Sequence, residues 1–125
     1  MAYATQQKAV LSRIITKSDR PLTAQEILAE AQKDLPNLGI ATVYRALKQF
    51  QEDSQVRVVE IPGATPHYES AAAHHHHFFL CQQCQKLFNL VGCVKGLDAL
   101  APKKFSVRRH EIVLYGDCAD CLRAA

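Results

Sequence analysis

The first half of the chain contains three segments in which apolar residues recur every three or four positions. Residues 5–16 form the first, and their apolar stripe, interrupted by basic side chains, predicts an amphipathic helix. Thr23 and Glu26 have the spacing of a capping box, which predicts that a second helix begins near Ala24. After a turn rich in helix-breaking residues, the apolar side chains of residues 40–50 fall on one face of a third helix.

A β-branched run follows the third helix and predicts a hairpin. Residues 56–61 form the first expected strand, a Pro-Gly pair makes the turn, and residues 66–69 return as the second strand. Three helices followed by a hairpin are the arrangement of a winged helix-turn-helix domain, which we assign to residues 1–69. Small side chains at the start of residues 70–77 have little to pack against, so this segment is expected to be a hinge.

The remaining chain, residues 78–125, predicts a second and smaller α/β domain. Its expected elements are strands at residues 77–80 and 87–90, a short helix at residues 97–100 and a longer strand at residues 105–115. The chain as a whole is therefore expected to be α+β.

Composition indicates the cellular compartment and the need for a cross-link or a partner. With 125 residues, 48% hydrophobic and 22% charged, the chain should fold, but two domains of this size are each short of core. It contains no apolar run long enough for a signal peptide or a membrane span, so we expect a cytoplasmic protein without a membrane partner. In a reducing compartment, its five cysteines are expected to bind metal rather than to form disulfides.

Two Cys-x-x-Cys pairs provide the strongest chemical signal: Cys81 with Cys84, and Cys118 with Cys121. A two-residue spacer lets both sulfurs of a pair reach one tetrahedral zinc ion. Four thiolates leave no open coordination position, so the expected role of this zinc is structural. The alternatives are a redox pair or unrelated buried thiols.

A run of four histidines, residues 74–77, precedes the first cysteine pair. In an extended chain, alternate histidines face opposite sides, so the run can supply two different metal sites. Further candidate ligands are His67, Glu69, Cys93 and His110, although each alone is more often a core or surface residue.

The polar face of the third expected helix carries groups that can reach bases and phosphates in a major groove. A mixed polar face is usually only solvated, but its place before a hairpin favours DNA binding. With one residue of the first helix, the candidate DNA-binding residues are Lys8, Thr42, Tyr44, Arg45 and Lys48.

Three stretches together resemble the ferric uptake regulator superfamily: GIATVYRAL at residues 39–47, the histidine run before the first cysteine pair, and LYGDCADC at residues 114–121. The resemblance implies a homodimeric repressor, with residues 78–125 as its dimerisation domain, that binds palindromic double-stranded operator DNA when a divalent metal fills a regulatory site. It also implies that His75, His77 and His110 are regulatory ligands. The family usually completes this set with a carboxylate, and we infer that Cys93 replaces it here; Cys93 as a small buried hydrophobe is the alternative.

The same resemblance assigns Glu69 and His76 to a possible second regulatory site, to which His67 could add a ligand. Pro21 and Phe78 stand where two further histidines are expected, so this site is incomplete. Imidazoles with one thiolate suit Zn²⁺ better than Fe²⁺ or Mn²⁺, so we expect a zinc-uptake regulator. We also expect that metal binding orders residues 71–77.

Several other functions remain open. An iron-, manganese- or peroxide-sensing regulator of the same family is the main alternative. A zinc-dependent hydrolase is disfavoured because no carboxylate lies beside the histidine run as a general base, and we expect no enzyme. A zinc-binding adaptor without DNA binding would leave the winged-helix half unexplained.

Overall fold

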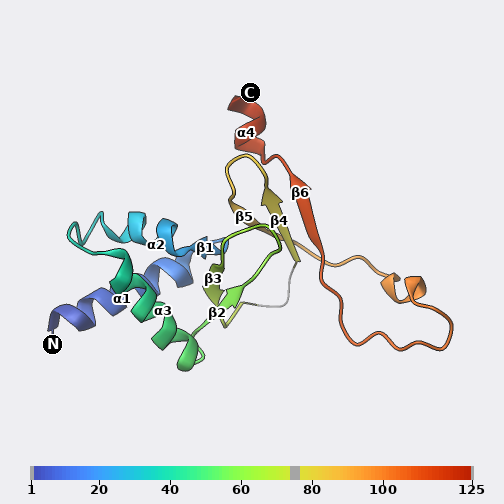
Figure 1. Cartoon of the computed structure of the whole chain (residues 1–125), viewed down its shortest axis with the longest axis horizontal. Coiled ribbons are helices and arrows are strands. Elements are labelled where there is room, and N and C mark those ends of the chain that lie inside the picture. The colour runs from blue at the N-terminus through green and yellow to red at the C-terminus, as the bar shows by residue number, and fades with distance from the viewer. Residues whose placement is uncertain (1, 74–76, 125) are drawn as a thin grey trace. The chain divides into compact units, whose positions relative to one another are not determined.

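The structure, a computed structural model of the chain, describes residues 2–73 and 77–124. The chain divides into two compact units, residues 1–74 and residues 75–125, each with helical segments and a three-stranded sheet (Figure 1). The α+β class predicted from the sequence is confirmed. None of the helices in the described residues has the length and apolar content needed to cross a membrane.

The first unit is a winged helix. Its elements in chain order are α1 (Ala2–Lys17), β1 (Leu22–Thr23), α2 (Ala24–Ala31), α3 (Ile40–Glu52), β2 (Val56–Val59) and β3 (His67–Ser70). The strands form an antiparallel sheet in the order β1-β3-β2. The hairpin predicted after the third helix is therefore present, and β1, which the sequence did not predict, adds a two-residue edge.

The first unit has a substantial apolar core. Leu11 and Ile15 of α1, Ile27 of α2 and Val43 of α3 are all 3% exposed or less. Of the 19 buried apolar side chains among the described residues, 16 belong to this unit. The helical stripes seen in the sequence are thus the faces that the three helices bury.

The capping box predicted at the start of α2 is confirmed. Thr23 Oγ1 accepts a hydrogen bond from the Glu26 backbone N–H at 3.1 Å, and Glu26 Oε1 accepts one from the Thr23 N–H at 3.0 Å. Arg20 donates to the other Glu26 oxygen at 2.5 Å. Burial raises the pKa of Glu26, but these hydrogen bonds outweigh it and lower the pKa below its usual 4.5.

Glu26→Gln is expected to destabilise the winged-helix unit at pH 7 by about 1 kcal/mol, because the amide still caps Thr23 but loses the charged bond to Arg20. The lowered pKa makes this contribution complete above about pH 4.5, and it disappears as Glu26 becomes protonated at lower pH. Urea unfolding followed by circular dichroism at pH 7 and at acidic pH measures the difference. An equal loss at both pH values would contradict this role of the charge.

The second unit is built around the strand β4 (His77–Cys81). On one side β4 pairs antiparallel with β5 (Leu87–Leu90), and on the other it pairs parallel with β6 (Val113–Gly116). Between β5 and β6 lies the 3₁₀ helix η1 (Leu97–Leu100), and α4 (Ala119–Ala124) follows β6. The sequence predicted β4, β5 and η1 and missed α4.

The strand predicted at residues 105–115 is wrong over most of its length, since only its end forms β6. Pairing between β6 and β4 begins at Val113 opposite Phe78. No strand is assigned at residues 105–112, and Phe105 is 70% exposed. Strand propensity alone does not form a ladder, because each backbone group also needs a hydrogen-bonding neighbour.

The second unit has little apolar core of its own. Among its described residues only three apolar side chains are buried: Leu80, Cys81 and Leu87. Val94, Leu100 and other large apolar side chains are exposed. So small a core supplies little folding free energy, so this unit is expected to need a cross-link or a partner.

Candidate metal centres and nucleic-acid interface

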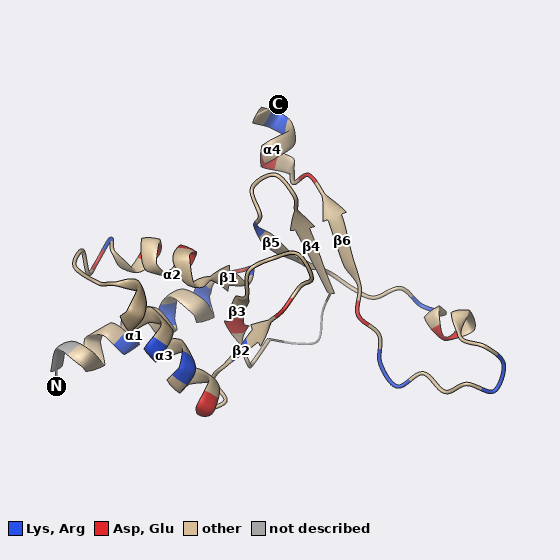
Figure 2. Ribbon diagram, viewed as in Figure 1, with Lys and Arg blue, Asp and Glu red and all other residues tan. Residues whose placement is uncertain are grey.

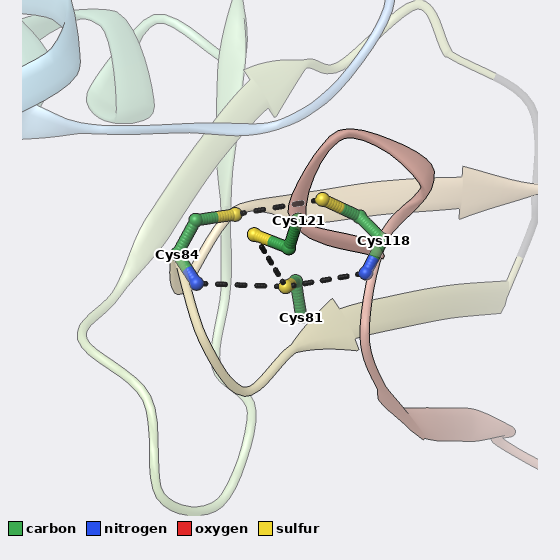
Figure 3. Close-up of side chains that lie close together, drawn as sticks. All are labelled: Cys81, Cys84, Cys118 and Cys121. Carbon is green, nitrogen blue, oxygen red and sulfur yellow. Dashed lines mark hydrogen bonds between the residues drawn. The ribbon is translucent and has the colours of Figure 1, made fainter. Parts of the chain in front are cut away.

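Four cysteines from separated parts of the chain converge in the second unit (Figure 3). Cys81 ends β4 and Cys84 lies in the turn that follows. Cys118 precedes α4 and Cys121 lies within it. The parallel pairing of β4 with β6 brings both Cys-x-x-Cys pairs to the same end of the sheet.

The spacing of the four sulfurs fits a tetrahedral zinc ion. The Sγ atoms of Cys81 and Cys121 are 3.7 Å apart, and those of Cys84 and Cys118 are 3.8 Å apart. A Zn–S bond of about 2.3 Å implies a tetrahedron edge of about 3.8 Å. All four sulfurs lie within 4.8 Å of one another. The donor set and its spacing therefore suit a structural zinc ion.

Backbone groups prepare Cys81 to carry negative charge. The N–H groups of Cys84 and Cys118 donate to its Sγ at 3.5 and 3.3 Å. The Cys84 bond is the largest cause that lowers the Cys81 pKa to about 6, against the opposing effect of burial. In the other direction, the hydrogen bond with Cys118 raises the pKa of Cys121 to about 12. Zinc binding must therefore displace a proton from Cys121.

A second cluster joins His77, Cys93 and His110. Cys93 Sγ lies 3.3 Å from His77 Nε2 and 2.8 Å from His110 Nε2. The two imidazole rings are 5.1 Å apart between centroids. The structure thus brings together three of the four expected regulatory ligands, and the fourth, His75, lies outside the described residues.

Two imidazole nitrogens and one sulfur suit a borderline-soft divalent ion such as Zn²⁺. Bond lengths of about 2.0 Å to nitrogen and 2.3 Å to sulfur imply nitrogen–sulfur edges of about 3.5 Å. The His77–Cys93 distance is close to this value, whereas the Cys93–His110 distance of 2.8 Å is shorter. Cys93 and His110 must separate slightly to hold an ion. Cys93 is exposed, unlike the buried hydrophobe of the alternative interpretation.

The backbone of the chain before β6 orients His77, a contact that the sequence did not predict. The Ile112 N–H donates to His77 Nδ1 at 3.1 Å, which directs Nε2 towards Cys93. His77 is also only 3% exposed, so its ring has little freedom to turn away.

The residues of the possible second regulatory site have other partners. His67 and Glu69 are both buried in β3, and the Nδ1 of His67 lies 2.8 Å from the Thr65 carbonyl oxygen. Glu69 Oε2 accepts a hydrogen bond from Arg57 Nε at 2.9 Å. Within the described residues no third ligand joins them, and His76 lies outside that part of the chain. The second regulatory site stays a prediction. A metal ion bound there would compete with Arg57 for the Glu69 carboxylate.

Arg57 was not singled out in the sequence, although it lies directly opposite Glu69 in the hairpin. Its guanidinium also donates to the Ala73 carbonyl at 2.8 Å, and the Ala71 N–H donates to the Gln55 carbonyl at 2.9 Å. Residues 71–73 are thus joined to the first unit by these hydrogen bonds. The expectation that metal binding orders residues 71–77 stays a prediction.

The polar face of α3 is exposed, as the spacing of its apolar residues requires. Tyr44 is 50% exposed, and Arg45 and Lys48 are also exposed. Thr42 accepts a hydrogen bond from the Arg45 guanidinium at 3.0 Å. A groove of about 400 Å³ between α1 and α3 is lined in part by Lys8, Thr42 and Arg45. Three of the five expected DNA-binding residues therefore line this groove.

The distribution of ion pairs also distinguishes this face. The first unit contains eight Lys or Arg residues, and Arg13, Arg20, Lys33 and Arg57 each pair with a carboxylate. Among the described residues the remaining four form no ion pair: Lys8, Lys17, Arg45 and Lys48. All four belong to α1 or α3 (Figure 2). Cations that form no ion pair within the unit are suited to phosphate contacts.

Comparison with known proteins gives a consistent result. The sequence model of the ferric uptake regulator family matches residues 2–115 of this chain. The ferric uptake regulation protein of Campylobacter jejuni is 33% identical over 122 residues, which cover 94% of this chain and 78% of that protein. The peroxide-responsive repressor PerR of Staphylococcus saprophyticus is 29% identical over 119 residues, covering 93% and 79% respectively.

A solved structure of FurB, a zinc uptake regulator from Mycobacterium tuberculosis, is similar along the whole chain. The TM-score is 0.54 at 27% sequence identity, and the match covers 96% of this chain and 95% of FurB. The similar proteins thus include regulators named for iron, for peroxide and for zinc, and their names alone do not select one signal for this chain.

Proposed function

We propose that this chain, which belongs to the ferric uptake regulator family, represses transcription in the cytoplasm as a homodimer on palindromic DNA and senses zinc. The members of this family are metal-dependent regulators and not enzymes. That membership disfavours the hydrolase and the adaptor considered from the sequence. The finer parts of the proposal are the metal, the residues that bind it and the operator contacts.

The observation that carries the choice of zinc is the composition of the cluster around Cys93. Its sulfur lies within 3.3 Å of two imidazole nitrogens, and His77, Cys93 and His110 contribute no carboxylate. Fe²⁺ and Mn²⁺ favour oxygen ligands, whereas imidazole and thiolate suit Zn²⁺. We assign the regulatory site to His75, His77, Cys93 and His110, and the structural zinc to the four other cysteines.

The proposed switch connects this site to the DNA-binding unit through the chain before β4. His77 begins β4, and residues 71–73 are attached to the first unit by hydrogen bonds from Arg57 and Ala71. Only a few residues therefore separate a regulatory ligand from the winged helix. Metal binding that favours one arrangement of the two units converts binding free energy into DNA affinity.

Metal content and DNA binding measured together test the proposal. The purified protein is stripped of labile metal and titrated with Zn²⁺, Fe²⁺ or Mn²⁺ while its binding to a pool of palindromic duplexes is followed. We expect about one zinc per chain to resist stripping at the four-cysteine site. DNA binding should return only when a second equivalent of zinc is added. Equal DNA binding by stripped and loaded protein would refute the metal switch.

Arg45→Ala is expected to lower the preference for an operator over a scrambled duplex by about 1–3 kcal/mol, because an arginine side chain reads bases. Lys48→Ala should instead weaken binding to both duplexes alike and reduce the salt dependence by about one phosphate contact. Titrations of both duplexes at several salt concentrations separate the two roles. If Arg45→Ala weakens both duplexes equally, Arg45 does not read the sequence.

Cys93→Asp is expected to shift the metal preference away from Zn²⁺ and towards Fe²⁺ or Mn²⁺, since it exchanges a soft sulfur for a hard oxygen. Metal-dependent DNA binding by the variant, titrated with each ion, measures the shift. We expect the relative affinity for zinc to fall by at least about tenfold. An unchanged order of metals would remove Cys93 from the ligand set.

A peroxide-sensing member of the family is the second candidate. Cys93 is exposed and its sulfur is 2.8 Å from a histidine nitrogen, and the chain is 29% identical to a peroxide-responsive repressor. An exposed cysteine sulfur is accessible to peroxide. If peroxide releases the zinc-loaded protein from DNA and a thiol reductant restores binding, the second candidate is favoured over the first.

A further inference from the structure

The winged-helix unit carries no net charge. Its eight Lys and Arg residues are balanced by eight Asp and Glu residues, so the net charge of +3 belongs entirely to the second unit. Within that unit, residues 95–109 contain five basic residues and one acidic residue. We call this segment the basic arm. Charge that could attract a polyanion from a distance is therefore concentrated outside the domain expected to read DNA.

The basic arm belongs to the 22-residue connection between β5 and β6, residues 91–112 (Figure 2). Connections of this length with little secondary structure are uncommon in compact domains and usually functional. All five cations are exposed, and within the described residues none of them forms an ion pair. They are Lys95, Lys103, Lys104, Arg108 and Arg109. By contrast, half of the cations of the first unit are paired with carboxylates.

The arrangement of these cations suits a long anion with repeated charges. Lys103 and Lys104 lie in a turn in which the Phe105 N–H donates to the Pro102 carbonyl at 3.0 Å, and Arg108 and Arg109 follow in the irregular chain beyond it. Phosphates follow one another every 3.4 Å along each DNA strand, so such a segment can contact several of them. Exposed side chains on an irregular segment do not enclose a small anion. Their charges act only within about 8–10 Å at physiological salt, so they must approach the phosphates closely.

We infer that the basic arm binds the phosphate backbone of duplex DNA and adds sequence-independent affinity to that of the winged-helix unit, whose net charge is zero. This inference rests on the proposed DNA-binding function and extends it to a second surface. The arm adds to the overall affinity and to its salt dependence, while the sequence is selected by the polar face of α3.

The test compares the full-length, zinc-loaded protein with the variant K103Q/K104Q on a non-palindromic duplex between about 50 and 200 mM KCl. A plot of log affinity against log salt concentration has a negative slope, and each lost phosphate contact makes it shallower by about 0.9. We therefore expect the slope of the variant to be shallower by about 1–2. At the lowest salt the affinity should decrease roughly tenfold. The variant K103R/K104R keeps both charges and should retain the wild-type slope.

The matched control is K33Q/K86Q, which removes the same net charge from exposed lysines outside the basic arm and outside the α1/α3 face. It should keep the wild-type slope. If the arm variant and this control behave alike, or if K103R/K104R loses binding as K103Q/K104Q does, the inference is wrong although DNA binding itself stands. If the wild-type protein binds no duplex, the proposed function fails as well.

Anionic lipid is the other extended anion that these cations could contact. Flotation with phosphatidylglycerol vesicles, using the same variants, distinguishes it from DNA. Vesicle binding that depends on Lys103 and Lys104, with an unchanged DNA slope, would overturn the inference. Wild-type protein that remains free of vesicles, together with the reduced DNA slope of the variant, supports it.

Discussion

Replacing Cys118 with Ser is expected to unfold the second unit and to leave the winged-helix unit folded. Only three apolar side chains are buried among the described residues of the second unit, against 16 in the first. Zinc bound by four thiolates contributes about 10–16 kcal/mol of folding free energy in comparable small sites. A serine hydroxyl cannot replace the thiolate, so the cross-link between the end of β4 and α4 is lost.

Hydrogen exchange read by mass spectrometry separates the two units in this experiment. Peptides from β4, β5 and β6 should lose protection in Cys118→Ser, whereas peptides from α2 and α3 should keep it. The zinc that survives dialysis should fall from about one per chain to nearly none.

Cys93→Ser is the matched control, since it removes a cysteine from the same unit but outside the four-sulfur cluster. The Cys93→Ser variant should keep its protection from hydrogen exchange and its tightly bound zinc. If Cys118→Ser and Cys93→Ser exchange alike and retain equal zinc, the four-cysteine site does not hold the second unit together.

The features predicted successfully from the sequence depend on local periodicity and on fixed ligand spacing. The apolar stripes of α1, α2 and α3 are buried, and the Thr23–Glu26 spacing produces the capping box. Two matched Cys-x-x-Cys pairs predicted a four-sulfur cluster without information about the sheet. Such signals are readable because the helical repeat and the geometry of a tetrahedral ion do not depend on distant parts of the chain.

The features that the sequence did not predict depend on which strands become neighbours. Arg57 reaches Glu69 because the hairpin register sets them opposite each other, and β6 is short because its pairing with β4 starts at Val113. The Ile112 N–H contacts His77 across the same parallel pair. Register couples residues far apart in sequence, and propensity alone does not specify it.

The charge balance of the two units was not predicted, because a sequence does not show which carboxylate a basic residue pairs with. Arg13 in α1 pairs with Asp34, and Arg20, after the end of α1, pairs with Glu26. The ion pairs reduce the free positive face to four side chains on α1 and α3. Total charge is therefore a poor guide to a nucleic-acid surface, and the unpaired charge is a better one.

Replacing His110 with Ala is expected to abolish zinc-dependent DNA binding and to leave the structural zinc in place. His110 Nε2 is one of three ligand atoms in the cluster and lies 2.8 Å from Cys93 Sγ. Loss of an outer contact to a metal ligand costs about 10–100-fold in affinity, so loss of a ligand itself should cost at least about 100-fold. Zinc titration of stripped protein, followed by binding to the palindromic duplex selected from the pool, measures this loss.

Glu111→Gln is the control for this experiment, because Glu111 follows His110 in the chain but does not belong to the cluster. It should respond to zinc as the wild-type protein does. His110→Ala should also keep about one zinc per chain after stripping, since the four cysteines are untouched. If His110→Ala binds DNA at the wild-type zinc concentration, the cluster around Cys93 is not the regulatory site. The possible second regulatory site, where Glu69 pairs with Arg57, is then the next candidate to test.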